Sequence, residues 1–287
     1  MHLQSSQHNF YVAYANHEGW GIVSPVLETR VQDDADLAYN VKPLPRFVAR
    51  PSNGGVAAII PARGGSKGIP HKAVKKLGKW PTIGWTIEAA KVAQSVDRVF
   101  VSTEDSDIAN TAELFGVEVL KRPACLAQDD SQNDEVATYC LRQMRHELHY
   151  YPETIILLQP TSPFRTTSQI DAALELYTPA ETVISCCVDT KFHWAIDEEE
   201  DYEAVPIGHN PMHRTGRQNI DDRDRLLYEN GAIYVIEAER LSQERCLRVP
   251  PFSLYLMDAL HSVDLDTQED WDYATWLVET GRINAEY

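Results

Sequence analysis

Short apolar runs alternate with longer amphipathic stretches along most of the chain from Val56 onwards. The runs have the length of buried strands, and the stretches carry apolar residues at helical spacing. The predicted strands are Val56–Ile60, Arg98–Ser102, Glu118–Leu120, Thr154–Leu158, Thr182–Val188, Ala232–Ile236 and Leu254–Met257. The predicted helices are Thr82–Ala93, Ser106–Phe115, Asn133–Leu148, Ser168–Leu176 and Thr267–Val278. This alternation predicts an α/β fold with a largely parallel, doubly wound, Rossmann-like sheet.

Two segments depart from the alternation. Residues 1–54 contain two strand-like runs, Phe10–Tyr14 and Trp20–Val23, which predict a short hairpin followed by loop or linker sequence. We therefore divide the chain into an N-terminal extension of unknown role at 1–54 and a main domain at 55–287. Within the main domain, residues 189–225 are polar, and their acidic run Asp197–Asp201 is typical of a solvated turn.

The chain has 287 residues, a formal net charge of −17 and a pI near 4.9. This acidity argues against nucleic acid or an anionic membrane as a partner, since both bind basic surfaces. The sequence has no apolar run of about 18 residues, the length that a membrane-spanning helix needs, and residues 1–30 lack a signal-peptide pattern. The cysteines are odd in number and contain no C-x-x-C pair, so we expect free buried thiols and a cytoplasmic location.

A basic, glycine-rich loop at Pro61–Lys72 follows the first predicted strand. Its glycines permit backbone angles closed to other residues, so successive N–H groups can turn towards one anion. The glycines are Gly64, Gly65 and Gly68, and the basic residues are Arg63, Lys67 and Lys72. Such a loop after a strand predicts phosphate binding, although it matches neither G-x-x-x-x-G-K-[ST] nor G-x-G-x-x-G. The alternative is a solvated basic turn.

Two aspartates, Asp264 and Asp266, lie two residues apart in a strand-like segment, where alternation places both side chains on one face. A carboxylate pair of this kind suits Mg²⁺, which prefers one or two carboxylates together with water and phosphate oxygens. The alternative is an exposed acidic pair before a helix, where negative charge is favourable in any case. Thr267 and Asp270 predict a capping box at the start of that helix.

Four motifs, taken together and in this order, resemble the acylneuraminate (CMP-sialic acid or nonulosonic acid) cytidylyltransferases. They are Ile60–Pro70 followed by Lys72, Leu157–Arg165, Asn230–Tyr234 and Val263–Thr267, and the resemblance covers about residues 56–280. It implies a fold of the nucleotide-diphospho-sugar transferase type, with a dimerisation and substrate arm at about 189–228 and a homodimer. The implied reaction joins CTP and a sugar acid into a CMP-sugar, with release of pyrophosphate.

The resemblance also implies roles for individual residues. The implied catalytic residues are Arg63, Lys72, Asp264 and Asp266, of which the two aspartates bind Mg²⁺, with Mn²⁺ as a possible substitute. The implied nucleotide-binding residues are Ala62, Arg63, Gly64, Gly65, Ser66, Lys67, Lys72, Arg122 and Asn133. The implied substrate-binding residues are Gln159, Thr161, Ser162, Arg165, Arg217 and Asn230. Ala73 departs from the family, which usually has asparagine there, so the side-chain amide that the family places near the nucleotide is absent.

The loop Gln159–Arg165 displays an amide, two hydroxyls and an arginine after a buried strand, a set that suits a polyhydroxy acid. Arg165 or Arg217 could pair bidentately with the sugar carboxylate. The alternatives are that Thr161 and Ser162 cap the next helix and that Asn230 forms a turn with Gly231.

Two other functions fit the same sequence. One is a nucleotidyltransferase of the same fold that acts on a sugar phosphate, for which we expect a more basic sugar pocket. The other is a catalytically silent relative that binds nucleotide, although such a protein has no need of the aspartate pair. The sequence does not distinguish among sialic, legionaminic, pseudaminic and KDO-type acids, and no side chain stands out as a dedicated general base.

Overall fold

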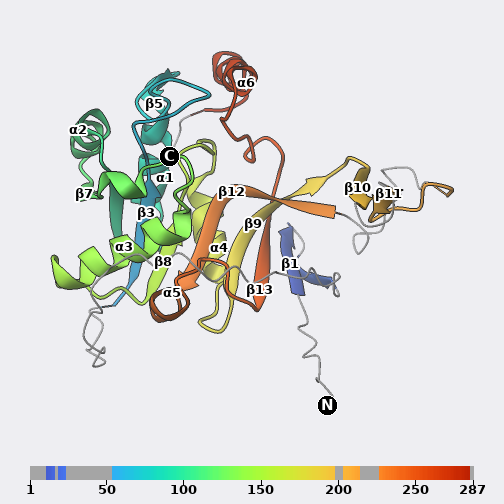
Figure 1. The fold of residues 1–287 in the computed structure, drawn as a ribbon, viewed down its shortest axis with the longest axis horizontal. Helices are drawn as coiled ribbons and strands as arrows, with labels where there is room; N and C mark the ends of the chain where they lie inside the picture. Colours follow the sequence, from blue (N-terminus) through green and yellow to red (C-terminus); the bar gives the residue numbers. More distant parts are fainter. Residues whose placement is uncertain (1–10, 17–18, 24–53, 198–202, 214–225, 285–287) are drawn as a thin grey trace.

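The computed structural model describes residues 11–16, 19–23, 54–197, 203–213 and 226–284. Its centre is a sheet whose strands, within these residues, run in the order β2-β1-β13-β9-β12-β8-β3-β6-β7 (Figure 1). The strands are β1 (Tyr11–Asn16), β2 (Gly19–Val23), β3 (Val56–Pro61), β6 (Arg98–Thr103), β7 (Glu118–Lys121), β8 (Thr154–Leu157), β9 (Thr182–Asp189), β12 (Leu226–Glu237) and β13 (Phe252–Met257).

Most neighbouring strands of this sheet are parallel, which confirms the predicted fold class. Strand β3 is parallel to β6 and β8, β6 to β7, and β13 to β9 and β1. Among the strands of the main domain, the exception is β12, which lies antiparallel between β8 and β9 and begins at Leu226, before the predicted start at Ala232. The predicted hairpin in the extension is also present, because β1 pairs with β2 antiparallel. Strand β1 joins the edge of the main sheet at β13.

Helices cover both faces of the sheet, as the doubly wound prediction requires. They are α1 (Thr82–Val92), α2 (Ser106–Leu114), α3 (Asn133–His146), α4 (Thr167–Leu176), α5 (Ala238–Glu244) and α6 (Gln268–Glu279), together with a single 3₁₀ turn at Ala124–Leu126. Along β3, Ala58 and Ile60 belong to the core beneath α1, α2 and α4. Ala57 and Ile59 belong to the core beneath α3 and α5. This period of two is expected for a strand buried on both sides.

A third apolar cluster fixes the segment between β13 and α6. Trp85 of α1 is 1% exposed, donates from Nε1 to the carbonyl oxygen of Leu77 at 3.0 Å and meets the ring of Phe164 edge-on. Leu265 and Trp271 belong to the same cluster. The chain around Leu265 is therefore held against α1 and the loop after β8, and two small strands, β4 (Lys76–Leu77) and β5 (Trp80–Pro81), lie nearby.

The predicted arm leaves the sheet after β9. It contains the antiparallel hairpin of β10 (His193–Asp197) and β11 (Glu203–Ile207), which projects beyond the sheet in Figure 1. Most of the predicted acidic turn, and Arg217, lie outside the described residues.

The five cysteines are free, as expected, and Cys140, Cys186 and Cys187 are buried. Cys125 is exposed and Cys246 only partly buried, so the expectation of burial is wrong for Cys125 and holds only in part for Cys246. Among the described residues, no helix has the length and apolar character needed to cross a membrane.

Candidate active site

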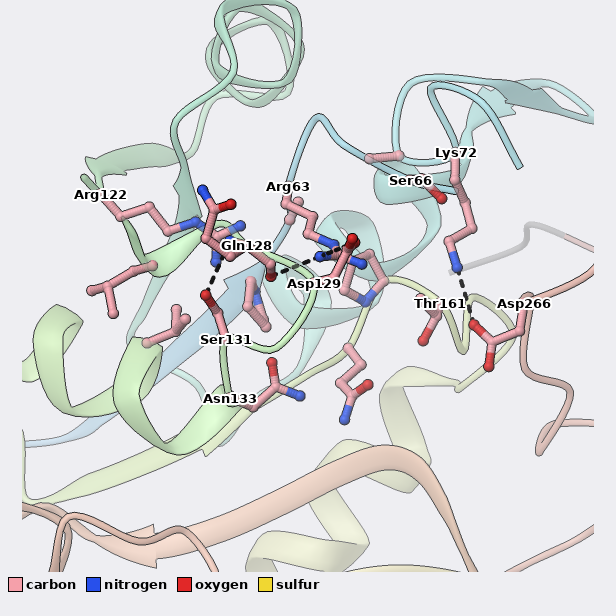
Figure 2. Close-up of a pocket in the computed structure, with 17 residues that line it drawn as sticks. Arg63, Ser66, Lys72, Arg122, Gln128, Asp129, Ser131, Asn133, Thr161 and Asp266 are labelled. Carbon is pink, nitrogen blue, oxygen red and sulfur yellow. Dashed lines mark hydrogen bonds and ion pairs between the residues drawn. The ribbon is translucent and has the colours of Figure 1, made fainter. Parts of the chain in front are cut away.

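The loops that follow β3, β7 and β8 surround a pocket of about 270 Å³ at the carboxyl edge of the sheet. This is the edge at which open α/β sheets bind ligands. Figure 2 shows its lining, which consists of Pro61, Ala62, Arg63, Ser66, Lys72, Ala73, Arg122, Leu126, Gln128, Asp129, Ser131, Asn133, Val136, Gln159, Pro160, Thr161 and Asp266. Parts of all the major motifs except Asn230–Tyr234 thus meet in one place.

Many of the predicted site residues line this pocket. They are Ala62, Arg63, Ser66, Lys72, Arg122, Asn133, Gln159, Thr161 and Asp266. The predicted residues outside its lining are Gly64, Gly65, Lys67, Ser162, Arg165, Asn230 and Asp264, and Arg217 is not among the described residues. Ala73, the departure from the family pattern, is part of the wall.

Lys72 joins the basic loop to the aspartate segment. Its ammonium donates to the backbone carbonyl of Leu265 and lies 3.2 Å from Oδ1 of Asp266 (Figure 2). The Lys72 side chain is only 15% exposed, whereas that of Asp266 is 70% exposed. The cation is therefore fixed against the protein, and the carboxylate remains open to a ligand.

Asp129 forms ion pairs with the other two cations of the loop, Arg63 and Lys67. One of its carboxylate oxygens lies 2.9 Å from Nη1 of Arg63, and the other contacts the ammonium of Lys67. The hydrogen bond from Lys67 is the main reason why the pKa of the Asp129 carboxyl lies below its ordinary value. Arg63 also donates to the carbonyl oxygen of Gln128 at 2.7 Å. None of the sequence motifs predicts that an acidic side chain occupies this position.

The glycines of the basic loop act through their small size. The structure corrects the expectation of unusual backbone angles, because none of Gly64, Gly65 and Gly68 has a positive φ. A Cβ atom on Gly64 or Gly68 would come closer than 3.0 Å to Asp105 or to the backbone of Asp266, respectively, whereas one on Gly65 would meet open space. Two of the three glycines therefore permit the close approach of neighbouring segments.

The two aspartates lie in an extended loop and not in a strand, which corrects the predicted local structure. The predicted alternation is nevertheless present, because Asp264 and Asp266 are exposed on either side of the fully buried Leu265. Helix α6 begins directly after them with the predicted capping box of Thr267 and Asp270. A buried anchor and a helix cap together fix the direction of both carboxylates.

The Asp264 carboxyl turns towards the loop after β8. Its Oδ1 lies 3.4 Å from Oγ of Ser162. Desolvation raises the pKa of the Asp264 carboxyl, and a hydrogen bond from Thr161 opposes that rise. The residue as a whole remains exposed, so one part of the carboxylate is shielded by the protein while the rest faces outward.

Within the described residues, no group of three or more His, Cys, Asp or Glu side chains is arranged to hold a metal ion. A closed structural site built from such side chains needs more ligands than a pair supplies. The Asp264–Asp266 pair is of a different kind, because Mg²⁺ often takes one or two carboxylates and completes its shell with water and substrate phosphate.

Arg165 supports the site from inside the protein. It is fully buried and donates from Nε to the carbonyl oxygen of Ala232 at 2.9 Å, from Nη1 to Oγ1 of Thr86 at 2.8 Å, and to the carbonyl oxygen of Gln159. The expectation that Arg165 pairs with a sugar carboxylate is therefore wrong for this geometry. Its guanidinium fixes the backbone that carries the Gln159 side chain into the pocket.

Asn230 and Ser162 are also structural in this arrangement. The Asn230 amide is 3% exposed, donates to Oγ of Ser262 at 2.9 Å and accepts from Oγ of Ser185 at 2.6 Å. Ser162 is fully buried and donates to the Asn230 carbonyl. The alternative of a turn with Gly231 is wrong as well, because both residues lie within β12, at an irregularity where the register shifts and Gly231 has a φ of 71°.

The alternative in which Thr161 and Ser162 cap the helix after β8 is wrong. Thr166 caps α4 and forms a capping box with Gln169. Thr161 remains on the pocket wall, where its backbone carbonyl accepts from Leu265 at 2.9 Å.

Fold and pocket together define a nucleotidyltransferase-like α/β protein, in which a basic loop faces a carboxylate-bearing segment at the sheet edge. The sequence profile described as Cytidylyltransferase matches residues 57–278. The chain belongs to this cytidylyltransferase family.

Curated relatives agree with this assignment. N-acylneuraminate cytidylyltransferase A of Danio rerio is 34% identical over 76% of this chain and 50% of its own length. The N-acylneuraminate cytidylyltransferase of Escherichia coli O18:K1:H7 is 31% identical over 76% of this chain and 51% of its own length. This chain thus spans about half the length of these two relatives. CMP-N,N'-diacetyllegionaminic acid synthase of Legionella pneumophila is 28% identical over 78% of this chain and 96% of its own length.

Solved structures share the fold at low sequence identity. A CMP:2-keto-3-deoxy-manno-octonic acid synthetase complexed with CTP superposes with a TM-score of 0.57 at 18% identity, covering 79% of this chain and 99% of that one. A 4-diphosphocytidyl-2C-methyl-D-erythritol synthase gives a TM-score of 0.58 at 14% identity, covering 78% of this chain and 98% of that one.

The close approach of Gly68 to Asp266 leads to a test within one loop. We expect Gly68→Ala to displace the aspartate segment, because the added Cβ would meet backbone that cannot rotate away. Thermal unfolding should show a lower Tm, with a cost of about 1–3 kcal/mol, the range for overpacked sites. Gly65→Ala is the matched control and should leave Tm nearly unchanged, since open space surrounds that position. Equal Tm values for the two variants would contradict the proposed contact.

Proposed function

We propose that this protein transfers CMP from CTP to the anomeric hydroxyl of a nonulosonic, sialic-acid-like sugar acid, with release of pyrophosphate. The observation that carries the proposal is the contact between Lys72 and Asp266. It brings the basic loop, the aspartate segment and the loop after β8 to one pocket. The family assignment and the names of the curated relatives support the same reaction.

The basic loop supplies the charge that a triphosphate needs. Arg63 and Lys72 line the pocket, and Lys67 lies beside them through its contact with Asp129. A triphosphate carries more negative charge than the single Asp129 carboxylate, so its oxygens compete for the same donors. Pyrophosphate gains charge as it leaves, and fixed cations stabilise that charge without reorganising during the reaction. Positioning and electrostatics are the main contributions to phosphoryl transfer.

The Asp264–Asp266 pair fits Mg²⁺, with Mn²⁺ as a substitute, because two exposed carboxylates stand beside a cationic phosphate-binding loop. These two residues would hold the ion. Mg²⁺ in such a site would neutralise phosphate charge and increase the acidity of a bound hydroxyl. Lys72 would then contact both Asp266 and the triphosphate, since its ammonium already lies beside Asp266 and the residue lines the pocket.

The sugar acid would lie against the loop after β8. Gln159 and Thr161 present an amide and a hydroxyl to the pocket there, and both groups hydrogen-bond readily to sugar hydroxyls. Arg165 is fully buried and donates to two backbone carbonyls and to Thr86. We therefore assign recognition of the sugar carboxylate to Arg217, which lies outside the described residues.

We also propose a homodimer formed through the arm. The β10–β11 hairpin leaves large apolar side chains exposed, including Trp194 at 46%, Ile196 at 67% and Ile207 at 44%. Exposed apolar side chains that gather on one projecting element are typical of protein interfaces. A cytoplasmic location is likewise a prediction, supported by the free thiols.

If the arm forms the dimer interface, a substitution in the arm should lower the mass of the particle in solution. Ile196→Glu should convert the dimer largely to monomer, because a charge would be buried without a partner. Light scattering coupled to size-exclusion chromatography measures this directly. Leu114→Glu is the control, since Leu114 is 88% exposed on α2, away from the arm. A wild-type monomer, or an Ile196→Glu dimer, would contradict the proposal.

The reaction itself is tested by pyrophosphate release from CTP and Mg²⁺ with a panel of nonulosonic acids. We expect pyrophosphate release with at least one acid. The rate of release should fall at least about 100-fold in Asp266→Ala, since mutation of residues that only hydrogen-bond to metal ligands already lowers activity about 10–100-fold. Asp272→Ala removes an exposed carboxylate from α6, in the same part of the chain, and should retain activity.

The remaining outcomes of that assay separate the alternatives. Release with a sugar phosphate alone would replace the sugar acid in the proposal. No release with any acceptor would favour a nucleotide-binding protein without this activity. Undiminished release by Asp266→Ala would refute the metal role of the aspartate pair.

A further inference from the structure

We propose that Glu104 is a positioning residue of the nucleotide site, which holds Arg122 and the basic loop in one fixed relation. The inference rests on the proposed function only in taking a nucleotide as the ligand. Glu104 directly follows β6 and is not among the residues that the motifs indicate. Its carboxylate connects Arg122, which lines the pocket, to the backbone of the basic loop at Gly64.

Both oxygens of Glu104 are used. Oε1 accepts from the backbone N–H of Gly64 at 2.8 Å, and Oε2 accepts from Nε of Arg122 at 3.1 Å. The side chains are shielded, with 21% of Glu104 and 4% of Arg122 exposed. A charge-assisted hydrogen bond in such surroundings is stronger and better oriented than one on the surface.

The contact decides which way Arg122 points. The Arg122 side chain is almost fully buried, and a buried guanidinium needs a paired anion. Because Glu104 accepts from Nε, the two terminal nitrogens of the planar guanidinium extend beyond the pair. Figure 2 shows Arg122 reaching towards the pocket from the wall opposite Lys72. Glu104 therefore presets a donor pair of the kind that suits a nucleotide oxygen.

The same carboxylate fixes the start of the basic loop. Gly64 is the residue next to Arg63, and its backbone packs against Asp105 so closely that a Cβ atom would collide with the Asp105 carboxylate. Asp105 is itself held as the N-cap of α2, where it accepts from the N–H groups of Asp107 and Ile108. Glu104 therefore precedes a residue that is fixed by a helix cap, and its carboxylate in turn holds the Gly64 backbone and the Arg122 side chain in place.

The amide variant separates the two contacts. In Glu104→Gln, the amide oxygen can still accept from Gly64 N–H, but the amide nitrogen cannot accept from Arg122. We expect Glu104→Gln to weaken CTP binding about tenfold, as loss of a supporting hydrogen-bond partner does in other sites. KM for CTP should rise by a similar factor with kcat within about twofold, because Arg122 would bind ground state and transition state alike.

A double-mutant cycle shows whether Glu104 acts through Arg122. Calorimetric CTP affinities are measured for Glu104→Gln, Arg122→Ala and the double variant. The double variant should bind CTP no more weakly than Arg122→Ala alone, because residues that act as one unit are not additive. Asp107→Asn is the control, an exposed carboxylate on α2 that should leave CTP affinity unchanged.

Two results would overturn the inference. One is additive losses in the cycle, and the other is a Glu104→Gln variant that loses Tm but keeps wild-type CTP affinity. If the wild type binds another nucleoside triphosphate and not CTP, the proposed function fails, and the cycle is run with that nucleotide. A wild type that binds none of ATP, GTP, UTP and CTP would overturn both proposals.

Discussion

The contact of Lys72 with the Leu265–Asp266 backbone and carboxylate is the interaction on which the whole site depends. It joins residues 194 positions apart in the chain. The same junction is closed by Gly68, whose lack of a side chain lets the basic loop lie against the Asp266 backbone. Leu265 is fully buried in the cluster around Trp85. The first and last motifs therefore form one unit, held by packing as well as charge.

A chain with a net charge of −17 can bind a polyanion only where basic residues are concentrated and oriented. In this structure, carboxylates inside the candidate site hold the cations in place. Asp129 lies between Arg63 and Lys67, while Glu104 lies between Arg122 and Gly64. Pairing lowers the cost of keeping like charges close together before a ligand arrives. Under the proposed function, the phosphate groups of the ligand would compete with these carboxylates for the same cations.

Periodicity predicted the strands and helices well, because burial on both faces leaves an apolar run that is visible in sequence. It could not show the direction of β12, since pairing partners are distant in the chain. The motifs located the pocket, and Arg63, Lys72, Gln159 and Asp266 all line it. They misassigned Arg165 and Asn230, because a polar residue in a motif looks the same whether it faces a ligand or the core. Glu104 and Asp129 were missed because their partners come from other loops.

The most direct test of the account is a calorimetric comparison of CTP, CDP and CMP binding in the presence of Mg²⁺. If the loop at Arg63–Lys72 holds a triphosphate beside Asp266, affinity should fall at least about tenfold from CTP to CMP, because one hydrogen bond to a charged group contributes about 1.5–3 kcal/mol. Lys72→Ala should remove most of that difference. Equal affinity for CTP and CMP, or an unchanged difference in Lys72→Ala, would contradict the account.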